Sequence, residues 1–221
     1  MSRLVIFDCD GVLIDSEPIA CRVMAGVLTE IGFPLDEMDL RPFIGRAGPE
    51  TYAELESRFG KKLPDDIRQR MHAAFRLRLT DGMPQIGGVV DVIEALATPS
   101  CVASNSSHDY LRMTLGTAGL FETFAGRIFS SHDVERPKPH PDLFLHAATR
   151  MAATPEACIV VEDSVHGVNA GVAAGMRVIG FCGGSHCRDG HGDGLIAVGA
   201  ETVCANMDEV ARYLADHGYL R

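Results

Sequence analysis

Two aspartates separated by one residue are the part of this sequence best suited to chemistry. Asp8 and Asp10 follow the apolar run of residues 4–7 and precede Gly11. Two carboxylates this close repel each other, so the pair is costly unless a cation or a phosphoryl-transfer reaction uses it. The alternative is a solvated turn, in which aspartate and glycine are both common. The pair by itself leaves both interpretations open, because short motifs also occur by chance.

A second apolar run, residues 101–103, ends at Ser104 and Asn105, just before a predicted helix. Helix N-terminal amides and short hydroxyl side chains both donate hydrogen bonds to anions. This junction is therefore suited to hold a phosphate group. The alternative is ordinary helix capping by one of the serines in residues 104–107.

Two further polar groups lie later in the chain. Lys138 lies between two prolines that keep its backbone out of a helix, so it can present a fixed positive charge. The alternative is an exposed turn, where lysines are most common. The apolar run of residues 158–161 ends in Glu162 and Asp163, and adjacent acids at a strand end suit a hard cation with oxygen ligands.

The elements that carry these residues indicate an α/β fold. Short, continuous apolar runs that end in polar turns are typical of buried strands in a parallel sheet, where ligands bind beyond the carboxyl ends of the strands. Between the first strand and the rest, the pattern is helical, with helices expected at residues 19–28, 49–58 and 64–79. We therefore expect a Rossmann-like core of residues 1–15 and 85–221, interrupted by an all-helical domain of residues 16–84.

Taken together, these motifs resemble those of the haloacid dehalogenase superfamily of phosphohydrolases. The family's Asp-x-Asp-Gly-x motif matches residues 8–12, its Ser/Thr motif matches Ser104, its lysine motif matches Lys138, and its acidic pair matches Glu162 and Asp163. Residues 15–18 and 136–139 are similar to the subgroup of beta-phosphoglucomutase, phosphoglycolate phosphatase and 6-phosphogluconate phosphatase. The dehalogenases themselves lack the second aspartate, so Asp10 argues against dehalogenation.

The resemblance implies a role for each residue of the first motif. Asp8 would attack phosphorus and form an aspartyl-phosphate, which water then hydrolyses. Asp10 would be the general acid for the leaving oxygen and then the general base for water. The implied cofactor is Mg²⁺, held by the carboxylates of Asp8 and Asp163 and the backbone carbonyl of Asp10, while Glu162 is either a ligand or a neighbour of the ligands.

The resemblance also implies how substrate is held. Lys138 and Ser104 would bind the phosphoryl oxygens and stabilise the charge of the transition state, with Asn105 as a further donor. The helical domain would be a cap that closes over the site and selects the substrate. Candidate cap contacts are Glu17 and Arg46, although Arg46 is equally well explained as a solvated loop residue.

Three functions remain open. The first is a Mg²⁺-dependent phosphatase for a small phosphorylated metabolite, a sugar or sugar-acid phosphate. The second is a sugar phosphomutase, but that subgroup carries a histidine shortly after the acid that is Glu17 here, and residues 18–21 contain none. The third is a regulator that binds a phosphorylated metabolite without catalysis, which would have no need to keep both Asp8 and Asp10.

The whole-chain composition limits the partners and the compartment. The formal net charge is −10, which disfavours nucleic acid and anionic membranes as partners. We find no run of 18 apolar residues and no cleavable leader, so we expect a cytoplasmic protein. We also expect a monomer or a weak homo-oligomer. The seven cysteines are odd in number, and several lie in apolar strand runs, as expected for small buried residues in a reducing compartment.

One other group contains metal-ligand residue types. Four such residues, Cys182, His186, Cys187 and His191, lie in or beside a glycine-rich stretch, residues 183–194, after an expected strand at residues 177–181. The Cys-x4-Cys spacing is not paired with a second pair of ligands, as structural zinc sites usually require. The sequence therefore favours a simple loop here over a zinc site.

Overall fold

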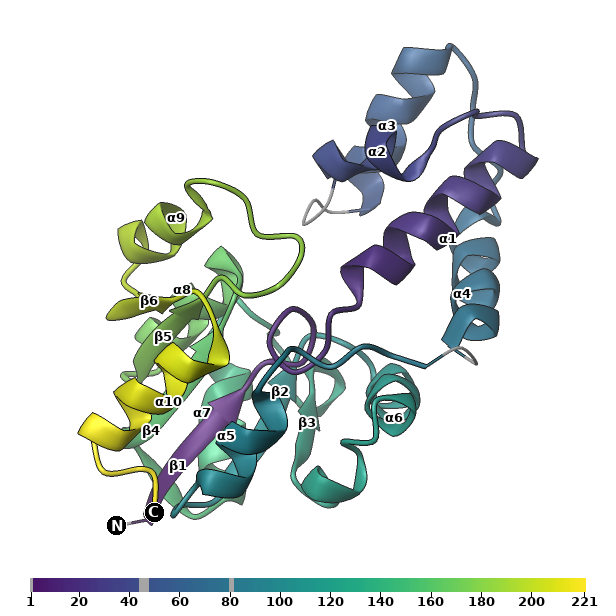
Figure 1. The fold of residues 1–221 in the computed structure, drawn as a ribbon. Helices are drawn as coiled ribbons and strands as arrows, with labels where there is room; N and C mark the ends of the chain where they lie inside the picture. Colours follow the sequence, from purple (N-terminus) through teal and green to yellow (C-terminus); the bar gives the residue numbers. More distant parts are fainter. Residues whose placement is uncertain (1, 44–47, 80–81) are drawn as a thin grey trace. The chain divides into compact units, whose positions relative to one another are not determined.

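The computed structural model describes residues 2–43, 48–79 and 82–221. In this part of the chain, parallel strands form a six-stranded sheet in the order β3-β2-β1-β4-β5-β6 (Figure 1). The strands are β1 (Ser2–Phe7), β2 (Ser100–Ser104), β3 (Ile128–Ser130), β4 (Ala153–Glu162), β5 (Arg177–Phe181) and β6 (Thr202–Cys204). The predicted Rossmann-like α/β fold is confirmed.

Helices cover both faces of this sheet, which explains why its strands read as continuous apolar runs. In Figure 1, α5 and α10 pack together in front of the sheet, while α7 and α8 lie behind it. Leu4, Ile6, Cys158 and Val160 belong to the apolar cluster that includes α7 and α8. The helices are α5 (Val89–Ala95), α6 (His108–Thr117), α7 (Asp142–Arg150), α8 (Val165–Ala173), α9 (His191–Ala197) and α10 (Met207–Asp216).

The chain folds into two compact units. The core unit comprises Met1–Asp15 and Met83–Arg221, and the helical unit comprises Ser16–Gly82. The helical unit has an apolar core of its own, in which Leu28, Phe33 and Leu55 are completely buried. Its helices are α1 (Glu17–Glu30), α2 (Glu37–Leu40), α3 (Gly48–Phe59) and α4 (Ile67–Arg78).

Two predicted boundaries were wrong. The helix expected from residue 64 begins at Ile67, after a turn in which Ile67 N donates to Pro64 O. The loop expected to continue to residue 194 ends at Gly190, whose left-handed backbone (φ 81°) lets α9 begin at His191. Among the described helices, none combines the length and the apolar character that a bilayer span requires.

The strand order predicts a ligand-binding position at the carboxyl ends of β1 and β4. Successive strands run outward from β1 through β2 to β3, and then on the other side from β4 through β5 to β6. At this reversal the last residue of β1, Phe7, pairs with Val161 of β4. Asp8 and Glu162 therefore come next to each other at the carboxyl ends of two adjacent strands, where open α/β sheets bind their ligands.

Candidate active site

Lys138 connects the acids that follow β1 with those at the end of β4. Its Nζ atom donates to Asp8 Oδ1 at 2.6 Å and to Glu162 Oε2 at 2.7 Å. The three side chains are buried, with 3% of Lys138, 11% of Asp8 and 1% of Glu162 exposed. The sequence predicted each of these three residues as a site residue, at a strand end or in a loop. Although they lie far apart in the sequence, they form one charged network.

The backbone of Lys138 is held by Asn105. The Asn105 side-chain oxygen accepts from Lys138 N at 3.0 Å, and its nitrogen donates to Lys138 O at 3.1 Å. Both ends of this amide therefore position the lysine, and donation from Asn105 to phosphate, which the sequence suggested, stays a prediction. An ion pair between Arg136 and Asp142, with Nη2 and Oδ1 2.8 Å apart, closes the same loop at the start of α7.

Glu162 has a neighbour for each of its oxygens. Oε2 accepts from Lys138, and Oε1 accepts from the backbone N and the hydroxyl of Ser164 at 3.1 and 2.8 Å. The Ser164 hydroxyl also caps α8 by accepting from Gly167 N at 3.0 Å. With its oxygens engaged in this way, Glu162 is placed to orient Lys138.

Asp10 lies in a different environment from Asp8. Its carboxylate accepts from Tyr110 Oη at 2.9 Å and from Ser106 Oγ at 3.1 Å. Ser104, at the end of β2, is almost fully buried and its hydroxyl accepts from Ser106 N at 3.2 Å. The segment after β2 therefore supplies hydroxyl groups to Asp10 as well as a candidate phosphate contact.

The buried acids carry more negative charge than Lys138 can balance. Burial raises the pKa of the Asp8 carboxyl well above its ordinary value, and the Glu162 carboxylate raises it further, while Lys138 opposes them. Burial and Glu162 raise the pKa of Asp163 in the same way. Burial alone would lower the pKa of Lys138, but Asp8 and Glu162 outweigh this effect and the net pKa is raised.

A cation would relieve this imbalance. Carboxylate oxygens of Asp8, Glu162 and Asp163 lie within 4.8 Å of one another, an arrangement that hard divalent cations favour. A Cβ atom at Gly11 would lie 1.9 Å from Asp163 Oδ2, and the φ of Gly11 is +79°. Glycine at this position thus allows the turn after Asp10 to approach Asp163.

Two residues of the network were not singled out as active-site residues from the sequence. His186 Nε2 lies 2.8 Å from Asp163 Oδ2, and the imidazole is 9% exposed. Tyr110 contacts Asp10 from the first turn of α6. The position of His186 soon after β5 is a signal that could have found it, because that strand also ends at the ligand-binding edge. No sequence motif marks Tyr110.

Two further residues, Glu17 and Arg46, are predicted substrate contacts. Glu17 begins α1 of the helical unit. Arg46 lies outside the described residues. Their roles remain predictions.

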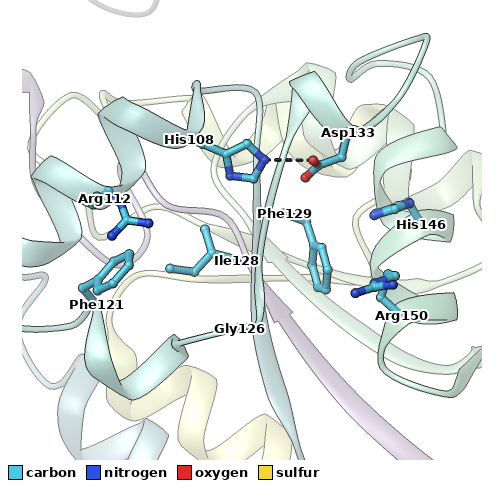
Figure 2. Close-up of a pocket in the computed structure, with 9 residues that line it drawn as sticks. All are labelled: His108, Arg112, Phe121, Gly126, Ile128, Phe129, Asp133, His146 and Arg150. Carbon is cyan, nitrogen blue, oxygen red and sulfur yellow. Dashed lines mark hydrogen bonds and ion pairs between the residues drawn. The ribbon is translucent and has the colours of Figure 1, made fainter.

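A separate pocket lies at the β3 edge of the core unit (Figure 2). It has a volume of about 400 Å³ and is lined by α6, α7 and the segment around β3, with Arg112, Phe129 and Arg150 among its residues. His108 and Asp133 meet across it, with Nε2 and Oδ1 2.8 Å apart. None of the predicted catalytic residues lines this pocket, so the chemistry is assigned to the strand-end network.

The fold and the network define the class to which this protein belongs: Rossmann-like α/β proteins with an acidic, lysine-bridged site at the carboxyl ends of the strands. A family model described as haloacid dehalogenase-like hydrolase matches residues 5–181. The chain belongs to this family, as its motifs predicted.

Several of the named relatives are phosphatases. A 6-phosphogluconate phosphatase of Escherichia coli K12 is 35% identical over 190 residues, covering 84% of this chain and 86% of that protein. A fructose-1-phosphate phosphatase of the same organism is 30% identical, covering 79% and 94% of the two chains. A haloacid dehalogenase family hydrolase from Deinococcus radiodurans R1, solved with bound phosphate and sodium, is 33% identical with a TM-score of 0.86, covering 99% and 97%. The chain is accordingly an enzyme of the phosphoric monoester hydrolase class.

Proposed function

We propose that this protein is a Mg²⁺-dependent phosphatase that hydrolyses a small phosphorylated metabolite through an aspartyl-phosphate. The observation that supports this most directly is the buried contact of Asp8 with Lys138, beside the carboxylates of Glu162 and Asp163. A buried acid at a strand end with a fixed ammonium group beside it suits a nucleophile that must meet an anionic substrate.

In this proposal Asp8 and Asp10 divide the chemistry. The Asp8 carboxylate attacks phosphorus, and the bond to the leaving oxygen breaks as Asp10 gives that oxygen a proton. Asp10 then takes a proton from the water that hydrolyses the aspartyl-phosphate. The hydroxyl groups of Tyr110 and Ser106 support this assignment because they fix the Asp10 carboxylate while leaving Lys138 to Asp8.

Lys138 and Ser104 bind the phosphoryl oxygens in the proposed mechanism. Both are buried at or beside the strand ends, where their donors cost little reorganisation during the reaction. Asn105 and Glu162 act through Lys138, the first on its backbone and the second on its ammonium group.

The acidic cluster fits Mg²⁺, for which Asp8, Asp163 and the backbone carbonyl of Asp10 are the proposed ligands. When bound, the ion offsets the repulsion between the Asp8 carboxylate and the substrate phosphate. The raised pKa of Asp8 and of Asp163 supports the need for added positive charge.

The proposed substrate is a sugar phosphate or a sugar-acid phosphate. The support comes from the relatives, which are named for 6-phosphogluconate and fructose 1-phosphate. We propose that the helical unit serves as the cap that selects among such compounds, with Glu17 and Arg46 as contacts. A phosphomutase with the same nucleophile is the second candidate, but the lack of histidine in residues 18–21 favours hydrolysis.

The test is phosphate release from a panel of sugar and sugar-acid phosphates, with isomerisation of a sugar 1-phosphate measured in parallel. We expect hydrolysis in Mg²⁺, background rates in EDTA, and recovery when Mg²⁺ is restored. Asp8→Asn should stay at background in every condition because it lacks the nucleophile. Full activity in EDTA or in Asp8→Asn would refute the mechanism, and isomerisation without net phosphate release would identify a mutase.

A further inference from the structure

A second group of metal-ligand side chains lies beyond the end of β5. Cys182 follows the strand, Cys187 lies in the loop, and His191 is the first residue of α9. Ligand atoms of these three residues, one from each, lie within 4.8 Å of one another, and all three residues are only partly buried. The group consists of sulfur and nitrogen donors, whereas the acidic cluster offers only oxygen.

The hydrogen bond of His191 prepares its other ring nitrogen to bind a metal. His191 Nε2 lies 2.6 Å from the backbone oxygen of Asp163. A carbonyl oxygen only accepts hydrogen bonds, so Nε2 must carry the proton, and in the neutral ring Nδ1 then has a free lone pair. Metal-binding histidines almost always donate their second ring nitrogen to a carbonyl or carboxylate in this manner, which fixes the tautomer and the ring orientation.

The backbone around the two cysteines is also fixed. Cys182 N donates to Cys204 O of β6 at 2.8 Å, and Cys187 N donates to Gly184 O at 3.0 Å. His186 Nε2 lies 3.5 Å from Cys187 Sγ. The backbone that carries the two thiols is therefore held by edge strand β6 and by a tight turn, on a loop rich in glycine.

We propose that Cys182, Cys187 and His191 form a binding site for a thiophilic divalent cation of the zinc type, with water at a fourth position. Two thiolates and one imidazole select Zn²⁺ and similar ions over Mg²⁺, which prefers oxygen ligands. Binding replaces two thiol protons, so one metal ion enters and two protons leave.

The proposed site adjoins the acidic cluster at Asp163, which two histidines of this loop contact. His191 contacts the backbone oxygen of Asp163, and His186 contacts its carboxylate. The sequence had favoured a plain loop because it offered no second ligand pair in the chain. The structure brings His191, the first residue of α9 and already part of that group in the sequence, close to both cysteines.

The experiment uses the full chain, stripped with EDTA, fully reduced and kept without oxygen. Co²⁺ is titrated in the presence of excess Mg²⁺, and the sulfur-to-cobalt charge-transfer absorbance is recorded, because carboxylate ligands do not produce this band. We expect one Co²⁺ per chain, displaced by one Zn²⁺. Cys182→Ser and Cys187→Ser should each weaken Co²⁺ binding at least about tenfold and reduce the band. His191→Gln should weaken binding while keeping the sulfur band.

The matched control is Cys158→Ser. Cys158 Sγ donates to Thr154 O at 3.2 Å, a bond that a hydroxyl can keep, and this cysteine is not part of the cluster. It should bind Co²⁺ as the unaltered chain does, and circular dichroism of each variant checks the fold. The proposal is overturned if the reduced chain gives no sulfur band, or if all three cysteine variants bind alike. A third outcome is also decisive. If the reduced protein shows no sulfur band and a Cys182–Cys187 disulfide forms in air, the metal site is refuted and the pair is a redox-active dithiol.

Discussion

Lys138 holds a positive charge between the buried carboxylates of Asp8 and Glu162, and its ammonium group also lies 4.7 Å from the ring centre of Phe144. A buried ion pair contributes little net stability when complete, because removing both charges from water is costly. Removing one partner is different, since it leaves the other charge buried without compensation. The residue is thus required for charge balance whatever its part in the chemistry.

We expect Lys138→Met to lower the free energy of unfolding by about 3 kcal/mol at neutral pH in EDTA, because Asp8 and Glu162 lose their counter-charge. Urea denaturation gives the value. The matched control is Lys62→Met, which removes an exposed pair with Glu56 in which the Lys62 side chain is 88% exposed. That change should fall within about 0.5 kcal/mol of the unaltered protein. Similar losses for the two variants would contradict the burial of the Lys138 network.

At the scale of elements, α8 packs its first turn directly on the site. A Cβ atom at Gly167 would lie 1.9 Å from Glu162 Cδ and 2.0 Å from Oε2. The helix can therefore approach β4 closely only with glycine here. The packing of α8 and the position of Lys138 depend on the same contact, because Glu162 makes both.

We expect Gly167→Ala to cost about 1–3 kcal/mol of stability and to reduce kcat, because the added methyl group displaces Glu162. Gly116→Ala in α6 is the matched control, since a Cβ there meets nothing within 4 Å. That change should stabilise the protein by about 0.5–1 kcal/mol, as expected for alanine in place of glycine in a helix. Thermal melts and steady-state kinetics measure both effects. If Gly167→Ala changed neither the stability nor kcat, Glu162 would not occupy this position in solution.

Arg177, the first residue of β5, forms two hydrogen bonds with Glu201, the residue before β6. In one of them Nε and Oε2 are 2.8 Å apart. Arg177 also donates to Tyr213 of α10 at 2.7 Å. The hydrogen bond from Arg177 lowers the pKa of Glu201 to about 2. A depressed carboxyl pKa adds stability above the unfolded value, near 4.5, and this stability is lost as the pH falls towards 2.

We therefore expect Glu201→Gln to be less stable than the unaltered protein at pH 7 and the difference to shrink between pH 4.5 and 2. The side chains of Arg177 and Glu201 are 33% and 44% exposed, so the difference at pH 7 should be below about 1 kcal/mol. Urea denaturation at pH 7, 4 and 3 measures it. High salt should also reduce the difference, and a gap that grows on acidification would contradict the ion pair.

The sequence predicted those site residues that belong to regular strand ends. Asp8 and Glu162 follow apolar runs, and parallel strands bring such ends to one edge. The contacts of Tyr110 and the double hydrogen bond of Asn105 depend on the angle of α6 and the path of a loop, which periodicity does not encode. The group at Cys182 was judged from the Cys-x4-Cys spacing, which does not show that His191, at the start of α9, lies close to both cysteines.

At the scale of the whole molecule, the chain folds into two units, and we propose that each has its own task. The core unit contains the charged network, and the helical unit has its own apolar core and interrupts the chain between β1 and α5. A phosphoryl site that is common to all substrates can then remain constant, while contacts in an inserted unit determine which ester is accepted. Substrate choice is the property that we assign to the helical unit.

We expect Glu17→Ala to change the relative kcat/KM among sugar phosphates by more than it changes the rate with a small aryl phosphate. Binding energy from a remote contact reaches the reacting centre only when the substrate is large enough to make that contact. Lys138→Ala is the comparison, and it should lower the rate with every ester. A uniform loss for Glu17→Ala would assign Glu17 to the catalytic group, and no change would make it a plain surface residue.

The central place of β1 in the sheet has a consequence for how the protein is made. β1 ends at Phe7, but its neighbours β2 and β4 begin only at Ser100 and Ala153. During synthesis one edge of this apolar strand has no partner until β2 has left the ribosome, and the other has none until β4 has, when most of the chain is made. Unpaired strand edges promote aggregation. The helical unit, with its own core, is translated in the meantime. Nascent chains that stop before β4 should therefore depend on chaperones far more than the completed protein does.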